Sequence, residues 1–199
     1  MMRKKPMLAY PVSKKPIDYS DKVSIQPKLD GVRCLIQLNH EANERGEFPI
    51  EAYSRTGKLW KNIDHILEEL YPFFDKHPNV ILDGELYNHE LKNDFEKIIS
   101  LVRKTKPTAE DRVESAEMVQ FHCYDIIEEF LGNNEKTVTN TSFETRNYFI
   151  HSNFGSMKPF NSDTNIIMVV DTKACGSESM AKMIHQQNLD NGYEGSIVR

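Results

Sequence analysis

Strand-like and helix-like segments alternate irregularly along this 199-residue chain, and their mixed order is the strongest constraint on its fold. Apolar runs bounded by turn residues predict strands, whereas an apolar stripe with a 3.6-residue period predicts helices. The expected strands outnumber the expected helices, which favours an α+β domain with largely antiparallel sheets. The expected strands are residues 23–27, 32–38, 49–55, 80–87, 118–127, 166–170 and 194–199, and the expected helices are 63–74, 91–102, a segment from 141 onward and 177–192.

Two polar segments are expected to be loops, and capping residues mark the ends of the later helices. Residues 103–117 are polar with mixed charge, and residues 131–142 carry Gly, Asn and Thr. Residues 141–144 have the capping-box spacing, which predicts that a helix begins there. Ser177 is expected to cap the last helix and Gly192 to end it.

The turn between the first two expected strands carries a possible nucleophile. Lys28 ends the first strand after Pro27, and Asp30-Gly31 predicts a tight turn that brings Lys28, Asp30 and Arg33 together. A lysine attacks only when neutral, so its usual pKa of about 10.4 must be lowered by a nearby cation such as Arg33 or a metal. A hairpin turn with an exposed lysine explains the same residues equally well.

Composition limits the class of protein. A net charge of -5 argues weakly against nucleic-acid binding, although net charge is a poor guide to local fields. No apolar run approaches the ~20 residues that a transmembrane helix needs, and no apolar run follows the basic start, so neither a membrane span nor a secretory signal is expected. The seven histidines form no zinc motif, and the cysteines, which form no CxxC pair, are expected to be reduced thiols: Cys34, Cys123 and Cys175.

Three further motifs place an acid or an aromatic at the edge of an expected strand. They are Asp83-Gly84-Glu85, Tyr124-Asp125 and Glu194-Gly195. A nucleotide site can use one carboxylate for the ribose, another for a metal and an aromatic ring for the base. Within these motifs, Asp83 is expected to fix the end of its strand, and the neighbouring His122 and Cys123 are expected to pack rather than bind a ligand.

Taken in order, these motifs resemble motifs I, III, IIIa and IV of the covalent nucleotidyltransferases, which include ATP-dependent DNA ligases, RNA ligases and mRNA capping enzymes. The matching residues are Lys28-x-Asp30-Gly31, Asp83-Gly84-Glu85, Tyr124-Asp125 and Glu194-Gly195-x-x-Val198. Other details resemble a small ATP-dependent DNA ligase of the bacteriophage or viral type: Lys-Pro-Met-Leu-Ala at 5–9, the Pro27–Cys34 core, Ser-Arg-Thr-Gly-Lys at 54–58 and Phe-Glu-Thr-Arg at 143–146. The resemblance covers nearly the whole chain. It implies an ATP-grasp-like nucleotidyltransferase (adenylation) domain over residues 1–199, with antiparallel sheets flanked by helices and a nucleotide cleft between the sheets.

The resemblance also implies a reaction. Lys28 would attack the α-phosphate of ATP, release pyrophosphate and form a lysyl-AMP intermediate. The AMP would pass to the 5′-phosphate of a DNA nick, and the 3′-hydroxyl would then displace AMP and seal the strand. Such phosphoryl transfer depends mainly on positioning and on neutralising charge, which arginines and Mg²⁺ (or Mn²⁺) can supply.

Individual roles follow from the same resemblance. Glu85 would hydrogen-bond the ribose, Tyr124 would stack on adenine, and Glu194 would help to bind the metal. The functional roles are favoured over the plain alternatives, in which Glu85 is a solvated acid at a strand end, Tyr124 a core aromatic and Arg55 a surface arginine. Arg33 and Arg55 would also engage the nick phosphate, and the full set of implied nucleotide-binding residues is Gln26, Pro27, Lys28, Leu29, Arg33, Arg55, Glu85 and Tyr124.

The implied partners are ATP and nicked duplex DNA, handled by a monomer without a membrane, in the cytoplasm of a bacterial cell or phage-infected host. DNA replication, repair or recombination would be its setting. Ligases of this type carry paired lysines after the Glu-Gly motif and then an oligonucleotide-binding (OB) domain, and neither lies within residues 1–199. We therefore expect an adenylation domain that is incomplete at its C-terminus and seals nicks weakly or not at all on its own.

Three alternative functions differ from an ATP-dependent DNA ligase in their substrate or in lacking catalysis. An NAD-dependent ligase is disfavoured, because only 27 residues precede Lys28 and the cysteines are not clustered. An RNA ligase or a capping-type guanylyltransferase would share the same motifs, although residues 54–57 favour DNA. A non-catalytic module that binds nicks would keep the fold without forming the lysyl-AMP bond.

Overall fold

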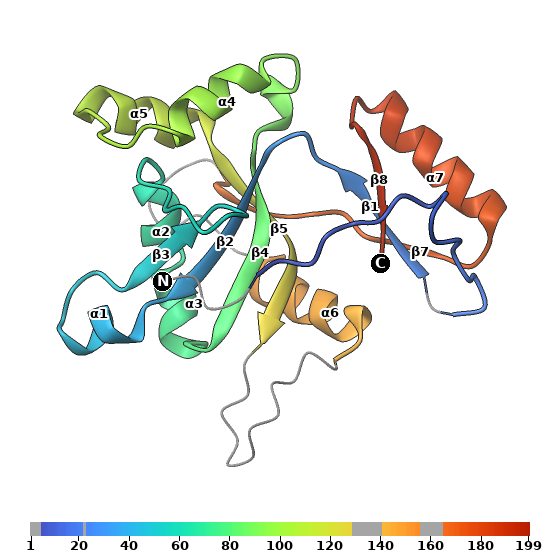
Figure 1. The fold of residues 1–199 in the computed structure, drawn as a ribbon, viewed down its shortest axis with the longest axis horizontal. Coiled ribbons are helices and arrows are strands. Elements are labelled where there is room, and N and C mark those ends of the chain that lie inside the picture. Colours follow the sequence, from blue (N-terminus) through green and yellow to red (C-terminus); the bar gives the residue numbers. More distant parts are fainter. Residues whose placement is uncertain (1–4, 22, 129–140, 156–164) are drawn as a thin grey trace, which may run out of the picture. The chain divides into compact units, whose positions relative to one another are not determined.

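The computed structural model describes residues 5–21, 23–128, 141–155 and 165–199 (Figure 1). The chain divides into two compact units. Among the described residues, the large unit contains Lys5 and those within Gly31–Val169, and the small unit contains those within Pro6–Asp30 and Val170–Arg199. Each unit is built around its own sheet. None of the helices in the described ranges is long and apolar enough to cross a membrane.

The small unit is a three-stranded antiparallel sheet with one helix. Its strand order is β7-β1-β8, with the strands β1 (Val23–Lys28), β7 (Lys173–Cys175) and β8 (Gly195–Val198). The helix α7 (Glu178–Asp190) begins at Ser177, whose side chain accepts a hydrogen bond from the backbone N–H of Met180. It ends just before Gly192, which has a positive φ of 85°. The predicted cap and stop of this helix are therefore confirmed.

The large unit contains a five-stranded sheet in the order β3-β2-β4-β5-β6. Neighbouring strands are antiparallel except β5 and β6, which are parallel. Alternate side chains of the central strands point into one apolar core, as the two-residue period of a strand requires. The strands are β2 (Val32–Leu38), β3 (Ile50–Tyr53), β4 (Val80–Tyr87), β5 (Gln120–Glu128) and β6 (Ile167–Val169).

Helices of the large unit supply the rest of this core. Ile66, Phe74, Ile98 and Ile150 all lie in it, and each is almost completely buried. The helical segments are α1 (His40–Glu44), α2 (Asp64–Glu69), α3 (Tyr71–Lys76), η1 (His89–Leu91), α4 (Phe95–Val102), α5 (Ala109–Met118) and α6 (Phe143–Phe154). The predicted α+β class with largely antiparallel sheets is confirmed.

The structure corrects the expected hairpin at the start of the chain. The strands on either side of Asp30-Gly31, β1 and β2, belong to different sheets. β1 pairs with β7 and β8, whereas β2 pairs with β3 and β4. Asp30-Gly31 is therefore the connection between the two units, and the hairpin interpretation of Lys28 is wrong.

Two helical predictions also need correction. The segment 103–117 is not a loop, because α5 occupies most of it and begins with a capping box formed by Thr108 and Asp111. This helix buries only Ser115 in its interior, so its sequence carries no apolar stripe. The single helix expected over residues 63–74 is divided at Leu70, with a proline in the first turn of α3. Most of the loop expected at 131–142 lies outside the described residues.

Candidate functional site

In the small unit, Lys28 and Glu194 form an ion pair where two strands meet. Lys28 is the last residue of β1 and is in register with Gly195, the first residue of β8. Glu194 precedes that strand, and its backbone N–H donates to the carbonyl of Lys28 over 3.2 Å. The Lys28 Nζ donates to the Glu194 carboxylate. Because the two side chains are 42% and 47% exposed, this pair is accessible to a substrate.

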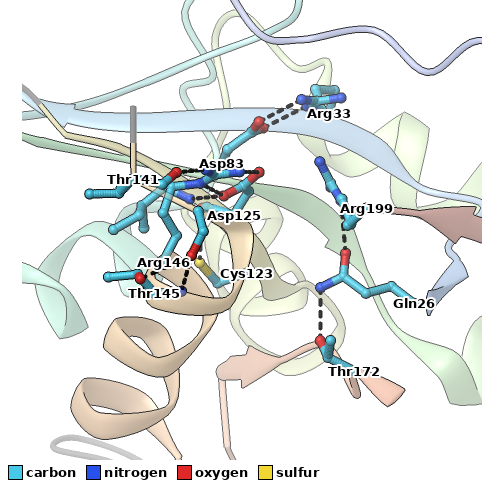
Figure 2. A network of polar contacts seen from close by, with 12 residues as sticks. Gln26, Arg33, Asp83, Cys123, Asp125, Thr141, Thr145, Arg146, Thr172 and Arg199 are labelled. Atoms are coloured by element: carbon cyan, nitrogen blue, oxygen red, sulfur yellow. Dashed lines mark hydrogen bonds and ion pairs between the residues drawn. The ribbon is translucent and has the colours of Figure 1, made fainter. Parts of the chain in front are cut away.

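Gln26 has a fixed orientation on the same face of β1 as Lys28, two residues away. It is buried, its amide Nε2 donates to Thr172 Oγ1 over 3.0 Å, and its Oε1 accepts from Arg199 Nε over 3.2 Å (Figure 2). The oxygen and nitrogen ends of the amide are thus distinguished by their partners. The two other predicted residues here, Pro27 and Leu29, are partly buried. Sequence reasoning missed the contributions of Thr172 and Arg199.

In the large unit, the structure brings together Arg33, Glu85 and Tyr124. Arg33 on β2 is in register with Glu85 on β4. The Tyr124 hydroxyl donates to Glu85 Oε2 over 3.3 Å, and the Arg33 guanidinium lies 5.1 Å from the centre of the Tyr124 ring. All three side chains are partly buried, so they combine a carboxylate, an aromatic face and a cation within one cluster.

Asp83 lies inside β4 rather than at its end, and it holds Arg33. The Arg33 Nε and Nη2 donate to the two carboxylate oxygens over 2.6 and 2.5 Å (Figure 2). Burial by itself would lower the pKa of Arg33, but the hydrogen bonds and negative charge of Asp83 raise it above its usual value. Arg33 is therefore a permanent cation with a fixed direction.

Arg55 lies on a tight turn that follows β3 in the large unit. Within this turn, the Ser54 hydroxyl accepts from the Lys58 N–H over 3.0 Å, and Gly57 has a positive φ of 83°. Arg55, Lys58 and the nearby Lys61 are exposed. The turn and the residues just after it therefore present three cations to solvent.

A divalent cation has one suitable predicted ligand, Glu194. No group of three or more His, Cys, Asp or Glu side chains that could hold a metal occurs in the part of the chain that the structure describes. Magnesium sites often use one or two carboxylates and complete their coordination with water and substrate phosphates. The Glu194 carboxylate, exposed beside Lys28, fits that kind of site.

Sequence reasoning also missed an ion pair next to Tyr124. Asp125 follows it on β5 and is bound by Arg146 from α6 (Figure 2). Arg146 belongs to the Phe-Glu-Thr-Arg segment that supported the family resemblance, but no partner for it could be deduced from the sequence. The helix start is close to the expected position, with Ser142 rather than Thr141 as the capping residue.

His122 lies beside the cluster of Arg33, Glu85 and Tyr124, and its ring is neutral. It is in register with Glu85, contacts Gln120 Oε1 at 3.0 Å through Nε2, and packs edge-on against Tyr87. Burial, with a smaller contribution from His89, lowers the pKa of His122 to about 4. Cys123 is buried in the core, which agrees with the packing role expected for both residues.

We predict that acid destabilises the protein through His122. Folding favours the neutral ring, so its stabilising contribution is present above the unfolded pKa of about 6.5 and is lost as the pH falls toward 4. The full loss is about 3 kcal/mol, at roughly 1.4 kcal/mol per pKa unit. Urea unfolding at pH 7 and pH 4.5 should give a smaller pH-dependent loss for His122→Gln than for the wild type. The control is His40→Gln at an exposed histidine, which should lose as much stability as the wild type. Equal losses in wild type and His122→Gln would contradict the prediction.

Comparison with known proteins adds three findings. A family model described as "ATP dependent DNA ligase domain" matches residues 6–199. DNA ligases of African swine fever virus are 29% identical over 178 residues, which cover 88% of this chain. The chain spans only 36% of the length of these curated viral relatives.

Solved structures share the fold. A Lig E DNA ligase aligns with 100% of this chain and 62% of its own chain, with a TM-score of 0.64 and 18% identity. An archaeal ATP-dependent RNA ligase aligns with 100% of this chain and 45% of its own, with a TM-score of 0.60 and 18% identity. At these identities the likeness establishes a shared fold, and the fold is common to enzymes that join DNA and RNA.

Proposed function

Because this chain belongs to the family of ATP-dependent DNA ligase domains, we propose that it takes AMP from ATP onto Lys28 and passes it to the 5′-phosphate of nicked duplex DNA. The observation that carries this proposal is the accessible Lys28–Glu194 pair at the start of β8. It joins an amine that can attack phosphorus to a carboxylate suited to a cation. The setting for the whole protein would be DNA replication, repair or recombination.

The first step forms a phosphoramidate bond. The neutral Lys28 Nζ attacks the α-phosphorus of ATP, the bond from that phosphorus to the bridging oxygen breaks, and pyrophosphate leaves. Lys28 must lose a proton before or during the attack. The Glu194 carboxylate accepts a hydrogen bond from Lys28 Nζ and therefore orients the amine in the free protein. A cation bound by Glu194 would supply neutralisation of the phosphate charge.

The next two steps move the AMP and then release it. An oxygen of the DNA 5′-phosphate attacks the same phosphorus, the phosphorus–nitrogen bond breaks, and Lys28 is regenerated. The 3′-hydroxyl then attacks the activated 5′-phosphate, and AMP leaves as the strand is sealed. Both steps are in-line phosphoryl transfers that depend on positioned cations, and Arg33 and Arg55 are our candidates for binding the nick phosphate.

The nucleoside is bound by side chains of a different kind. Glu85 is assigned to the ribose, whose hydroxyls are donors that a carboxylate can accept. Tyr124 is assigned to the adenine, because an aromatic face can stack on a base. Gln26, with its amide fixed by Thr172 and Arg199, is assigned to the edge of the base together with the neighbouring Pro27 and Leu29.

Incubation with α-labelled ATP or GTP tests this function. We expect label from ATP to remain covalently attached to the protein, and pyrophosphate to be released. Label from GTP alone would indicate a capping-type guanylyltransferase, and DNA binding without any label would indicate a non-catalytic module. Transfer of the labelled AMP to nicked DNA, but not to nicked RNA, would separate a DNA ligase from an RNA ligase.

The turn that carries Arg55 predicts a salt-dependent contact with DNA. Arg55→Ala and Lys58→Ala should each weaken binding to nicked duplex and reduce the slope of log affinity against log salt by about 1. Fluorescence anisotropy at several salt concentrations measures both quantities. Lys97→Ala is the matched control, because Lys97 is a half-exposed lysine of the same unit that already pairs with Glu114. Equal effects of all three substitutions would show that this turn does not contact the DNA specifically.

A further inference from the structure

Tyr124 is the extra residue of a β-bulge. Asp83 on β4 is in register with Asp125 on β5, but the next residue, Gly84, is in register with Cys123. Tyr124 therefore falls between these two register pairs. A bulge of this kind leaves one residue outside the ladder and re-aims its side chain.

The bulge reverses the alternation of side chains along β5. In a regular strand, Cys123 and Ile126 would point to opposite faces because they are three residues apart. Here both lie in the core of the large unit. Tyr124 is directed toward Arg33 and Glu85, and the adjacent Asp125 carboxylate binds Arg146.

The Asp125 carboxylate stabilises the bulge through hydrogen bonds. Its Oδ1 accepts from the backbone N–H of Ile126 over 2.9 Å and from Arg146 Nε over 2.6 Å, and its Oδ2 accepts from Arg146 Nη2 over 3.1 Å. The Asp125 side chain is only 2% exposed. A buried carboxylate held by three donors fixes the backbone on the C-terminal side of Tyr124.

Arg146 is itself anchored at the start of α6. Its Nη1 donates to the Thr141 carbonyl over 2.6 Å (Figure 2). Its guanidinium lies 5.6 Å from the centre of the Phe143 ring. One arginine thus connects the bulge to the first turn of a helix that is packed in the core. This gives the bulge a rigid support from a second element.

The ring of Tyr124 has weaker contacts of its own. Its hydroxyl reaches Glu85 over 3.3 Å, which is long for a hydrogen bond between oxygens, and the Arg33 contact is made at 5.1 Å. The bulge sets the backbone from which the ring projects. We propose that the Asp125–Arg146 ion pair positions Tyr124 to stack on the base of the bound nucleotide. This inference rests on the proposed function, in which Tyr124 is the stacking residue.

A double-mutant cycle on ATP binding tests the proposal. The Kd for ATP and the maximal rate of Lys28 labelling are measured for wild type, Tyr124→Ala, Arg146→Gln and the double variant. Loss of one base–aromatic stack weakens binding by about tenfold, so Tyr124→Ala should raise the Kd by about that factor. Arg146→Gln should raise the Kd similarly while the maximal rate stays within about threefold, and the double variant should be no more than about twofold weaker than either single variant.

The controls separate positioning from general damage to the fold. Arg112→Gln removes an exposed arginine of the same unit that pairs with Asp64, and it should change neither quantity. Circular dichroism checks that each variant is folded. If Arg146→Gln does not fold, the same cycle is measured with Asp125→Asn, which keeps an oxygen for the Ile126 N–H, and with Arg146→Lys, which keeps the charge.

The outcomes also distinguish this inference from the proposed function. If the two substitutions act independently, their tenfold effects multiply and the double variant binds ATP about a hundredfold more weakly than wild type. That result, with normal labelling of the wild type, would overturn the positioning role alone. A fall in maximal rate with an unchanged Kd would also overturn it. Wild-type protein that binds no ATP and takes no label would overturn both.

Discussion

Replacing Lys28 by alanine is expected to abolish covalent labelling by ATP, with a loss of at least about 10³-fold in rate, because the proposed reaction takes its attacking nitrogen from Lys28. Lys28→Arg should fail as well, since a guanidinium stays protonated and is a poor nucleophile. Both variants should remain folded, because the Lys28 side chain is 42% exposed and its ion pair with Glu194 lies at the surface. Single-turnover labelling with α-labelled ATP measures the rates.

The small unit offers a matched control for this substitution. Lys173 on β7 is 43% exposed and pairs with Asp171, so it resembles Lys28 in exposure and in having an acidic partner. Lys173→Ala should label at the wild-type rate. Labelling that survives in Lys28→Ala, or that is lost equally in Lys173→Ala, would disprove the assignment of Lys28 as the nucleophile.

Replacing Arg33 by glutamine is expected to produce the largest loss of stability, about 3–5 kcal/mol in the free energy of unfolding. Asp83 is almost completely buried, with its side chain 3% exposed, and Arg33 neutralises it through two hydrogen bonds. Without Arg33 this carboxylate remains buried but loses its two-pronged cationic partner, which is costly because a buried charge depends on such a partner. Urea denaturation at pH 7 measures the loss.

An ion pair with the same geometry but a different environment provides the comparison. Arg45 binds Glu47 through Nε and Nη2 over 3.0 and 2.8 Å, in the same two-pronged manner, but the two side chains are 55% and 59% exposed. Arg45→Gln should therefore change the unfolding free energy little, since exposed ion pairs contribute little. If both arginine substitutions cost the same, burial is not what makes the Arg33–Asp83 pair important.

Local sequence patterns predicted much of the fold. The strand over residues 80–87 was predicted with its observed bounds, and α7 was predicted from Ser177 and Gly192. These signals are local, because alternation, caps and stop residues act within a few positions of one another. The helix α5 was missed although its capping box at Thr108 and Asp111 is visible in the sequence. Its polar surface concealed the helical period.

The parts that were not predicted depend on pairing between distant segments. Asp30-Gly31 has the sequence of a hairpin turn, yet β1 finds its partners near residues 173–198 instead of in β2. The bulge at Tyr124 is a property of the register between β4 and β5, which no single segment encodes. Arg146 reaches Asp125 across 21 residues of sequence. Sequence therefore predicted the residue types for the site, whereas the structure supplied the contacts that hold them.

Mapping the site of AMP attachment tests the central claim most directly. The chain is incubated with ATP and a divalent cation, digested with a protease, and the modified peptide is located by tandem mass spectrometry under conditions that preserve phosphoramidate bonds. We predict a single AMP on Lys28 that disappears when pyrophosphate or nicked DNA is added. Pyrophosphate reverses the first step, and nicked DNA accepts the AMP. AMP on another residue, or no AMP on a folded protein that binds ATP, would contradict the claim.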